Sequence, residues 1–362
     1  MSADPTSAGQ VTVFGSLNAD LTVRVERFPD PGETLNGSEL VTAPGGKSSN
    51  QAVAAATLGS TVRLIGAVGD DTNGAFLLDQ AGDAGVDVSA VTRDADHATG
   101  SAMIVVDAAG ENTIIVSPGA NARHTAESVA SEQFSGADIV CLCLEVPLPA
   151  VEAAAKRGRE AGAQVLLNLS PYAEVPDAVL EHTDVLLVNQ SEAELMLGTH
   201  DIADDWAAAL DGFIDRGVRR AVVTLGADGA VVLDGTAAAD TSDGSDGSDG
   251  TAEADTSDRS DGSAGLDSAD GSDSAAGSDG ANVSNASGDG GDDTAQVTVI
   301  ASPTVDAVDT TGCGDAFTGA LAHGMAMGST LVDAAKLAAE AGALAATREG
   351  AQASYRAFSH LG

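Results

Sequence analysis

Two glycines and an aspartate near the C-terminal end form the strongest candidate for a catalytic centre in this chain. The segment Val308-Asp-Thr-Thr-Gly-Cys-Gly-Asp315 follows an apolar, strand-like run at 297–300 and opens onto a helix-like run at 316–327. The first N–H groups of a helix have no partner within it, and the helix dipole also favours negative charge there. We therefore expect the amides of Gly312, Cys313 and Gly314 to seat a phosphate, with Asp315 as the base that deprotonates an attacking hydroxyl. Taken alone, Asp315 is also typical of the first turn of a helix.

Polar side chains also follow predicted strands elsewhere in the chain. Asn18 and Asp20 come after a strand at 11–15, and Glu145 comes directly after another at 139–144. Ligands of open α/β sheets bind beyond the carboxyl ends of the strands, which is where these residues stand. An amide and a carboxylate spaced by one residue can hold vicinal hydroxyls of a sugar, although an Asx turn explains Asn18 and Asp20 equally well.

A glycine pair is the next candidate. Gly45 and Gly46 allow the backbone to approach a ligand closely, and Lys47 and Asn50 follow at the start of an expected helix. Gly46 and Lys47 are similar to part of a P-loop, but that motif requires glycine at position 41, where Val41 stands. The P-loop interpretation is therefore poor.

Two clusters indicate a nucleotide and its metal ion. Asn189 and Glu192 stand between a strand and a helix, where they could hold a hydrated Mg²⁺ against phosphate oxygens. A helix capping box is the alternative for this pair. Thr224, Gly226 and Gly229 belong to a glycine-rich turn that ends the next strand and suits a nucleotide. All these clusters would lie on one rim of a sheet, a coincidence that helix capping alone does not explain.

The hydrophobic pattern predicts an α/β fold. From residue 139 the chain alternates strands and helices, which favours a parallel sheet with helices on both faces. Alternating runs at 21–25, 35–41, 101–106 and 112–116 indicate half-buried antiparallel strands, the last two forming a hairpin.

These alternating strands, within about 17–43 and 99–117, would form a smaller sheet that stands off the main body as a lid. The chain, 1–362, is expected to be a single domain. A segment at about 236–295 consists largely of Asp, Ser, Gly, Thr and Ala, so we expect a solvated, disordered acidic insertion there.

Charge and composition restrict the partners. A formal net charge of -39 argues against nucleic acid and anionic membranes as partners, since both bind a basic face. No apolar run approaches the roughly 20 residues that a membrane span needs, and the polar N-terminus shows no secretory signal. Cys141 and Cys143 are too close to bridge easily, which favours a reducing cytoplasm.

Taken together, these residues resemble the ribokinase branch of the PfkB carbohydrate-kinase family. The resemblance runs from Val11 to about Ser354 and rests on Gly15-Ser-Leu-Asn-Ala-Asp20, Pro31-Gly-Glu33, Gly45-Gly-Lys47 with Asn50-Gln-Ala52, and Asp309-Thr-Thr-Gly-Cys-Gly-Asp315. It implies a doubly wound, mostly parallel α/β sheet flanked by helices, with a small β-sheet lid through which homodimers often form. It also implies transfer of the γ-phosphate of ATP to a sugar hydroxyl with Mg²⁺, and activation by K⁺.

Carried over by position, the resemblance assigns three groups of residues besides the anion hole and its base. The sugar site comprises Asn18, Asp20, Gly45, Gly46, Lys47, Asn50, Glu145 and Asp315. The nucleotide and Mg²⁺ region comprises Asn189, Glu192, Thr224, Gly226, Gly229 and Gly314. The site for the monovalent cation K⁺ comprises Asp309, Thr311, Ala345, Arg348, Gly350 and Ser354.

The resemblance predicts a kinase that phosphorylates D-ribose at its 5-hydroxyl with ATP. Ser48 and Ser49 stand where ribokinases usually have Gly-Ala, and Val146 stands where serine is common. These departures touch substrate choice, so a nucleoside, ribose 1-phosphate, fructose or 2-keto-3-deoxygluconate stays open as the acceptor. A non-catalytic sugar-binding regulator on the same fold is the alternative from another class.

Because the chain is acid-rich and poor in lysine, its self-repulsion needs screening by salt, and we predict a halophilic archaeon as its source. The free energy of unfolding should rise between about 0.1 M and about 1 M KCl, because the Debye length falls from ~10 Å to ~3 Å over that range. Urea unfolding at both salt concentrations measures this, and equal stability in the two would contradict the prediction.

Overall fold

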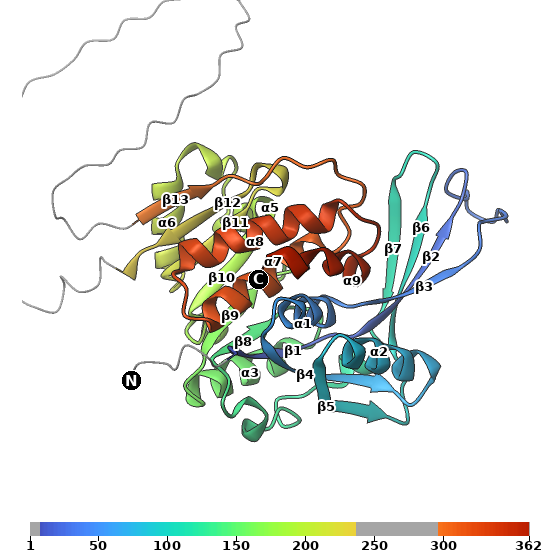
Figure 1. The fold of residues 1–362 in the computed structure, drawn as a ribbon, viewed down its shortest axis with the longest axis horizontal. Helices are drawn as coiled ribbons and strands as arrows, with labels where there is room; N and C mark the ends of the chain where they lie inside the picture. The colour runs from blue at the N-terminus through green and yellow to red at the C-terminus, as the bar shows by residue number, and fades with distance from the viewer. Residues whose placement is uncertain (1–7, 237–295, 362) are drawn as a thin grey trace, which may run out of the picture.

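The computed structural model describes residues 8–236 and 296–361 (Figure 1). The acidic insertion expected at 236–295 lies, apart from Thr236, outside the described residues. The chain leaves the described part after β12 (Ala230–Asp234) and returns in β13 (Gln296–Ile300). These two strands pair directly, with Asp234 opposite Gln296, so the intervening sequence is inserted into one hairpin of the sheet.

A nine-stranded sheet in the order β13-β12-β11-β10-β9-β8-β1-β4-β5 forms the centre of the molecule. Its pairs are parallel except β11–β12 and β12–β13, which are antiparallel. The central strands are largely apolar, as is typical of a parallel sheet that helices cover on both faces. The expectation of a doubly wound, mostly parallel sheet is thus confirmed. The other strands are β1 (Gln10–Phe14), β4 (Thr61–Gly69), β5 (Val86–Asp94), β8 (Ile139–Leu142), β9 (Gln164–Asn168), β10 (Val185–Asn189) and β11 (Arg220–Thr224).

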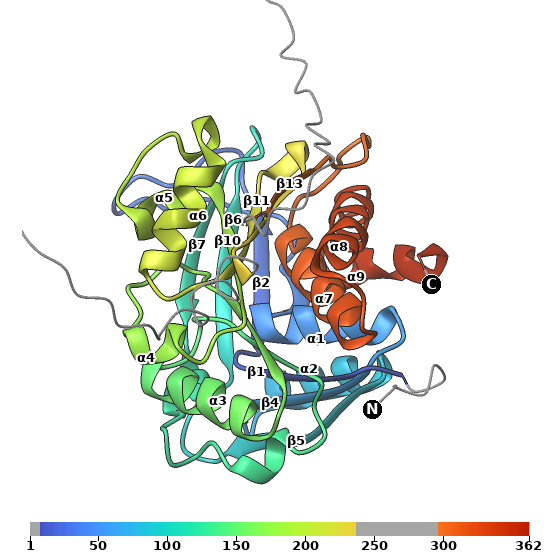
Figure 2. The same cartoon turned by 90° about the vertical axis from the view of Figure 1, so that its left-hand side faces the viewer.

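Helices lie on the two faces of this sheet, and each face has its own buried core (Figure 2). One face carries α1 (Lys47–Thr57), α2 (Thr72–Asp83), α7 (Cys313–Ala326), α8 (Leu331–Ala346) and α9 (Ala351–Ser354). The other carries α3 (Leu148–Glu160), α4 (Asp177–Leu180), α5 (Gln190–Leu197) and α6 (Trp206–Asp215). On the first face α1 and α7 approach closely at Gly319, where an added Cβ would lie 2.5 Å from the Gln51 carbonyl oxygen. Within the described residues, no helix combines the length and the apolar composition that crossing a membrane requires.

A smaller four-stranded sheet stands off the main body, as Figure 1 shows. Its order is β3-β2-β6-β7, from β2 (Asn18–Arg24), β3 (Val41–Gly45), β6 (Gly100–Val106) and β7 (Asn112–Ser117). The expected hairpin is confirmed as β6–β7, whereas the central pair, β2–β6, is parallel. We call this sheet the lid sheet.

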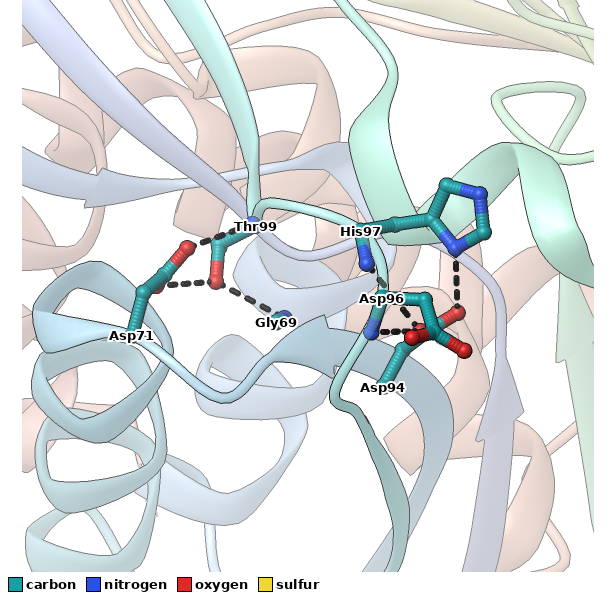
Figure 3. A network of polar contacts seen from close by, with 6 residues as sticks. All are labelled: Gly69, Asp71, Asp94, Asp96, His97 and Thr99. Carbon is teal, nitrogen blue, oxygen red and sulfur yellow. Dashed lines mark hydrogen bonds and ion pairs between the residues drawn. The ribbon is translucent and has the colours of Figure 1, made fainter.

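A polar network shapes the connection from β5 to the lid sheet (Figure 3). The Asp71 carboxylate caps α2 and accepts hydrogen bonds from the Thr99 amide (2.8 Å) and the Thr99 hydroxyl (2.6 Å). The Thr99 hydroxyl oxygen accepts from the Gly69 amide (2.9 Å). Asp94, at the end of β5, pairs with His97 Nδ1 at 2.9 Å. These contacts fix the path of the chain where it enters β6.

Two expectations about secondary structure were wrong, and one strand was missed. Residues 35–40 form no strand, and pairing of that segment begins only at Val41. Strand β5 was not predicted, although Val86, Val88 and Ala90 alternate with polar residues as in a half-buried strand. Helix α7 begins at Cys313 and not at 316, because Gly312 turns the chain in the left-handed region (φ 75°) directly before it.

Candidate active site

The start of α7 is built by Gly312. An added Cβ there would lie 2.5 Å from the Ala351 Cβ, so both the backbone angle and the space require glycine. The Gly312 carbonyl accepts a hydrogen bond from the Tyr355 hydroxyl at 2.9 Å. The Cys313 amide donates to the Thr310 carbonyl at 3.2 Å, whereas the Gly314 amide has no acceptor among the described residues. Of the three amides expected to seat a phosphate, only that of Cys313 is engaged among the described residues, and those of Gly312 and Gly314 are therefore free donors there.

Asp315 is buried in the first turn of α7, and α1 supplies its hydrogen-bond donors. Asn50 Nδ2 donates to Asp315 Oδ2 at 2.9 Å, and Gln51 Nε2 donates to Asp315 Oδ1 at 3.2 Å. Burial raises the pKa of Asp315 above its ordinary value, while Lys47 and the two amides act in the opposite direction. A carboxylate with a raised pKa suits a general base, since its proton affinity comes closer to the working pH.

The predicted sugar residues gather at the start of α1. Glu145 Oε2 accepts from the Ser16 hydroxyl (2.5 Å) and from the Lys47 amide (2.9 Å), which ties the end of β8 to this helix. The Asp20 carboxylate lies against Gly45, where a Cβ would collide with it. Burial, followed by the charges of Glu145 and Asp315, raises the pKa of Asp20 to about 7. Burial acts to lower the pKa of Lys47, but the neighbouring Asp315 and Glu145 outweigh it and raise that pKa.

Asn18 has a different environment from the other predicted sugar residues. It is 4% exposed, and its Oδ1 accepts from Asn121 Nδ2 at 2.8 Å. The Asn121 amide also bonds the backbone of Leu17. Asn18 therefore supports the junction between β1 and the lid sheet, and its contact with a sugar stays a prediction. Gly46, with φ 88°, packs directly on this backbone, since a Cβ there would lie 2.7 Å from the Asn18 amide nitrogen.

Two cavities meet at the start of α7. The larger, about 450 Å³, has a mainly apolar wall that includes Phe317 of α7 and Gly342 of α8. The smaller, about 270 Å³, contains Lys47 and Asp315. Gly314 lines both cavities, as do Thr224 and Thr310. The predicted nucleotide residues Gly226 and Gly229 line the larger cavity, whose volume and apolar wall suit a purine ring.

Asn189 and Glu192 form the capping box that was the alternative for this pair. Asn189 Oδ1 accepts from the Glu192 amide (2.8 Å), and Glu192 Oε2 accepts from the Asn189 amide (2.9 Å). Both residues also line the smaller cavity. The second carboxylate oxygen of Glu192 is not used by the capping box, so the site fits a hydrated Mg²⁺, which needs few protein ligands. In the described part of the chain, no three His, Cys, Asp or Glu side chains converge on one metal position.

The predicted cation residues come from two segments that the fold brings together. Asp309 Oδ1 accepts from the Thr311 amide (2.9 Å), and its Oδ2 accepts from the Gly350 amide (2.8 Å). Burial would raise the pKa of Asp309, but these amides lower it. Ser354 is buried, and its hydroxyl donates to the Ala351 carbonyl (2.6 Å). Ala345 is also buried, and Arg348 has an exposed side chain, so either could contribute only its backbone carbonyl to a buried ion.

A family model described as pfkB family carbohydrate kinase matches residues 8–243 and 275–357. The chain belongs to the pfkB family of carbohydrate kinases. It is 36% identical over 255 residues to a ribokinase of Haemophilus influenzae, covering 65% of this chain and 83% of the relative. It is 31% identical over 359 residues to a ribokinase of Schizosaccharomyces pombe, covering 95% of this chain and 94% of the relative.

A solved structure of Arabidopsis thaliana ribokinase complexed with ribose and ATP matches this fold with a TM-score of 0.76. The two chains are 25% identical, and the match covers 98% of each. The protein is thus an ATP-dependent carbohydrate kinase of the pfkB family.

Several residues that form hydrogen bonds in this kinase site were not predicted. Ser16 and Gln51 lie within the quoted motifs but had been given no role, although both bond a site carboxylate. Asn121 and Gln352 lie far from their partners in sequence, and Gln352 donates to Asn50 across 302 positions. Gln352 stands between Gly350 and Ser354 of the predicted cation segment, which was the only signal for it, and the sequence held no signal for Asn121.

The raised pKa of Asp20 predicts a trade between stability and sugar binding. A folded-state pKa near 7, against 3.8 for the free group, means that stability is present below pH 4 and is lost as the pH rises through 7. Asp20→Asn should therefore stabilise the sugar-free kinase at pH 8 by an amount on the order of 2 kcal/mol, and by almost nothing at pH 4.

The KM for the sugar of the unmodified kinase should rise as the pH falls below 7, because the protonated carboxyl is a poorer acceptor for hydroxyls. Thermal unfolding and initial rates from pH 5.5 to 8.5 measure both effects, and a pH-independent KM would contradict this role for Asp20.

Proposed function

We propose that this kinase transfers the γ-phosphate of ATP to the 5-hydroxyl of D-ribose. The observation that carries the proposal is the Asp315 carboxylate, held beside the free Gly314 amide where the nucleotide-sized cavity meets the cavity containing Lys47. A phosphoryl group crossing this junction would have a base on its acceptor side and a backbone donor within reach. The relatives named ribokinase support ribose as the acceptor.

The residues of this chain divide the chemistry among them. Asp20 and Glu145 accept hydroxyl hydrogens of the sugar, and the glycine at position 45 leaves space for this contact. Asp315 takes the proton of the attacking hydroxyl, and the bonds from Asn50 and Gln51 hold its oxygens in a fixed orientation. The Gly314 amide and Lys47 compensate the negative charge that builds on the transferred group.

Two metal ions complete the proposal. Glu192 would hold a hydrated Mg²⁺ in the smaller cavity, where the ion neutralises phosphate charge when it is bound. Oxygen atoms of Asp309, Thr311, Ala345, Arg348, Gly350 and Ser354 would hold K⁺. Oxygen donors suit both of these hard cations.

Turnover in KCl should exceed turnover in NaCl at equal ionic strength, and equal rates would contradict the K⁺ site.

The lid sheet is proposed to close over the sugar and to pair with a second copy of the chain. Strand β7 is exposed along its whole length, and Ile114, Ile115 and Val116 are each more than half exposed. Apolar side chains so exposed mark an interaction surface.

Ile115→Asp should shift the kinase from dimer to monomer in sedimentation velocity, whereas Thr113→Asp on the same strand should have less effect because it removes no large apolar contact. A monomeric unmodified protein would contradict the lid dimer.

Asp315→Asn tests the base. The amide keeps the shape but cannot take a proton, so turnover should fall by a factor of about 10²–10⁴. ADP affinity, measured by calorimetry, should stay within about twofold because no contact with the nucleotide cavity is lost. Near-normal turnover of this variant would refute the role of Asp315 as base.

The acceptor is tested with a panel of sugars. ADP formation would be compared for ribose, fructose, 2-keto-3-deoxygluconate, ribose 1-phosphate and nucleosides, and the highest kcat/KM is expected for ribose. A higher kcat/KM for another sugar would overturn ribose as the acceptor and leave the kinase activity itself in place. Absence of phosphoryl transfer to every acceptor would favour the sugar-binding regulator.

The cytoplasm is the proposed location, because ATP is supplied there and all three cysteines are free thiols.

A further inference from the structure

A short helix at the end of the chain reaches the sugar loop through one side chain. Gln352, in α9, extends its Nε2 to Asn50 Oδ1 at 3.0 Å and to the Ser49 hydroxyl oxygen at 3.1 Å. Asn50 in turn donates to Asp315 Oδ2 at 2.9 Å. Three hydrogen-bonded residues, Gln352, Asn50 and Asp315, therefore link α9 to α1 and then to the start of α7.

The direction of these bonds is determined by chemistry. An ionised Asp315 can only accept hydrogen bonds, so the Asn50 amide must present its Nδ2 to that carboxylate. Asn50 Oδ1 then points the other way and needs a donor, which Gln352 Nε2 supplies. Carboxamide oxygen and nitrogen are nearly equal in shape, so packing alone would not prevent Asn50 from flipping. The donor from Gln352 selects the orientation that stabilises the carboxylate.

The other oxygen of Asp315 is held separately. Gln51 Nε2 donates to Asp315 Oδ1 at 3.2 Å, while Gln51 Oε1 accepts from the Cys141 thiol at 3.4 Å. Gln51 therefore cannot replace the Asn50 bond, which is made to Oδ2. The two oxygens depend on different neighbours, and only the Oδ2 side involves α9.

We propose that Gln352 is a positioning residue for phosphoryl transfer, which acts by holding the Asn50 amide in the orientation that donates to Asp315. The inference rests on the proposed role of Asp315 as base. The Ser49 hydroxyl oxygen gives Gln352 a second acceptor. The Ser49 hydroxyl does not touch Asp315, and the Gln352–Asn50 bond is made separately from it.

Several ionisable groups also act on Asp315. Lys47, at the start of α1, favours its charged form, and Glu145 disfavours it. The remaining ionisable groups that interact with it are Asp20 of the lid sheet, Cys141 of β8, Cys313 of α7 and Tyr355 after α9. A change at Gln352 leaves all of these in place, so its effect on the titration of Asp315 can be separated from theirs.

Gln352→Glu is the decisive variant, because it preserves shape and removes the donor. The introduced carboxylate can only accept, so Asn50 would turn its Nδ2 away from Asp315 and present Oδ1 to it. With the lost bond and the added charge, the acid limb of the kcat–pH profile should move up by about 0.5–1 unit. At pH 7, kcat should fall by about 10–100-fold, while ADP affinity stays within about twofold. The kcat profile is used because it reports groups in the substrate complex, where Asp20 already binds the sugar.

Three controls make the result interpretable. Gln352→Met removes the donor without adding charge and should lower kcat by about 3–10-fold, a loss comparable to one hydrogen bond. Ser49→Ala keeps the Gln352–Asn50 bond and should leave the acid limb in place. Thermal unfolding and ADP calorimetry verify that each variant is folded, and if Gln352→Glu does not fold, Gln352→Met carries the test.

An acid limb and kcat of Gln352→Glu that match the unmodified kinase would overturn the positioning role. The same holds for Gln352→Met if it alone can be measured. Failure of the base assignment looks different, because Asp315→Asn would then retain turnover. An inactive Asp315→Asn together with an unchanged Gln352→Glu would refute only the role of Gln352.

Discussion

The arrangement of this kinase depends on burying one carboxylate at the start of a helix. Asp315 is almost completely removed from water, which would be costly without donors to its oxygens. Those donors, Asn50 and Gln51, are in α1, so α1 and α7 have to pack closely. The contact at Gly319, where a Cβ would lie 2.5 Å from the Gln51 carbonyl oxygen, allows that approach. The small residues of these helices are therefore a consequence of the site as much as of the core.

The sugar side carries an imbalance of charge. The carboxylates of Asp20, Glu145 and Asp315 lie near the ammonium of Lys47. Burial first, and then the charges of Glu145 and Asp315, raise the pKa of Asp20, so part of this shift is repulsion among the carboxylates. A sugar would relieve this repulsion, because its hydroxyls donate to carboxylates. The cluster thus gives up stability in return for sugar binding, as binding sites commonly do.

Much of the architecture could be predicted from the sequence because it is encoded locally. Buried strands are largely apolar, and polar residues at the ends of β1, β8, β10 and β11 mark the rim where the ligands of such sheets bind. The rest depends on contacts between distant segments. The Asn18–Asn121 and Gln352–Asn50 bonds span 103 and 302 positions and have no periodic signal. The nucleotide wall was also missed, because α8 contributes Ala339, Gly342 and Ala343, which read as ordinary packing residues. They form the wall of a cavity because their side chains are small and leave space beside the helix.

The pairing of β12 with β13 explains how the fold accommodates a long insertion between these two strands. Asp234 pairs with Gln296 at one end of this hairpin, while Ala230 pairs with Ile300 at the other, next to Gly229 and Ser302 of the nucleotide cavity. At about 3.3 Å per residue, the points of attachment lie roughly 13 Å along the strands from that cavity. Because the two ends of the insertion are already adjacent, its closure entropy grows only slowly with its length. The paired strands keep Gly229 in place, so the geometry of the nucleotide cavity does not require any contact from the inserted residues.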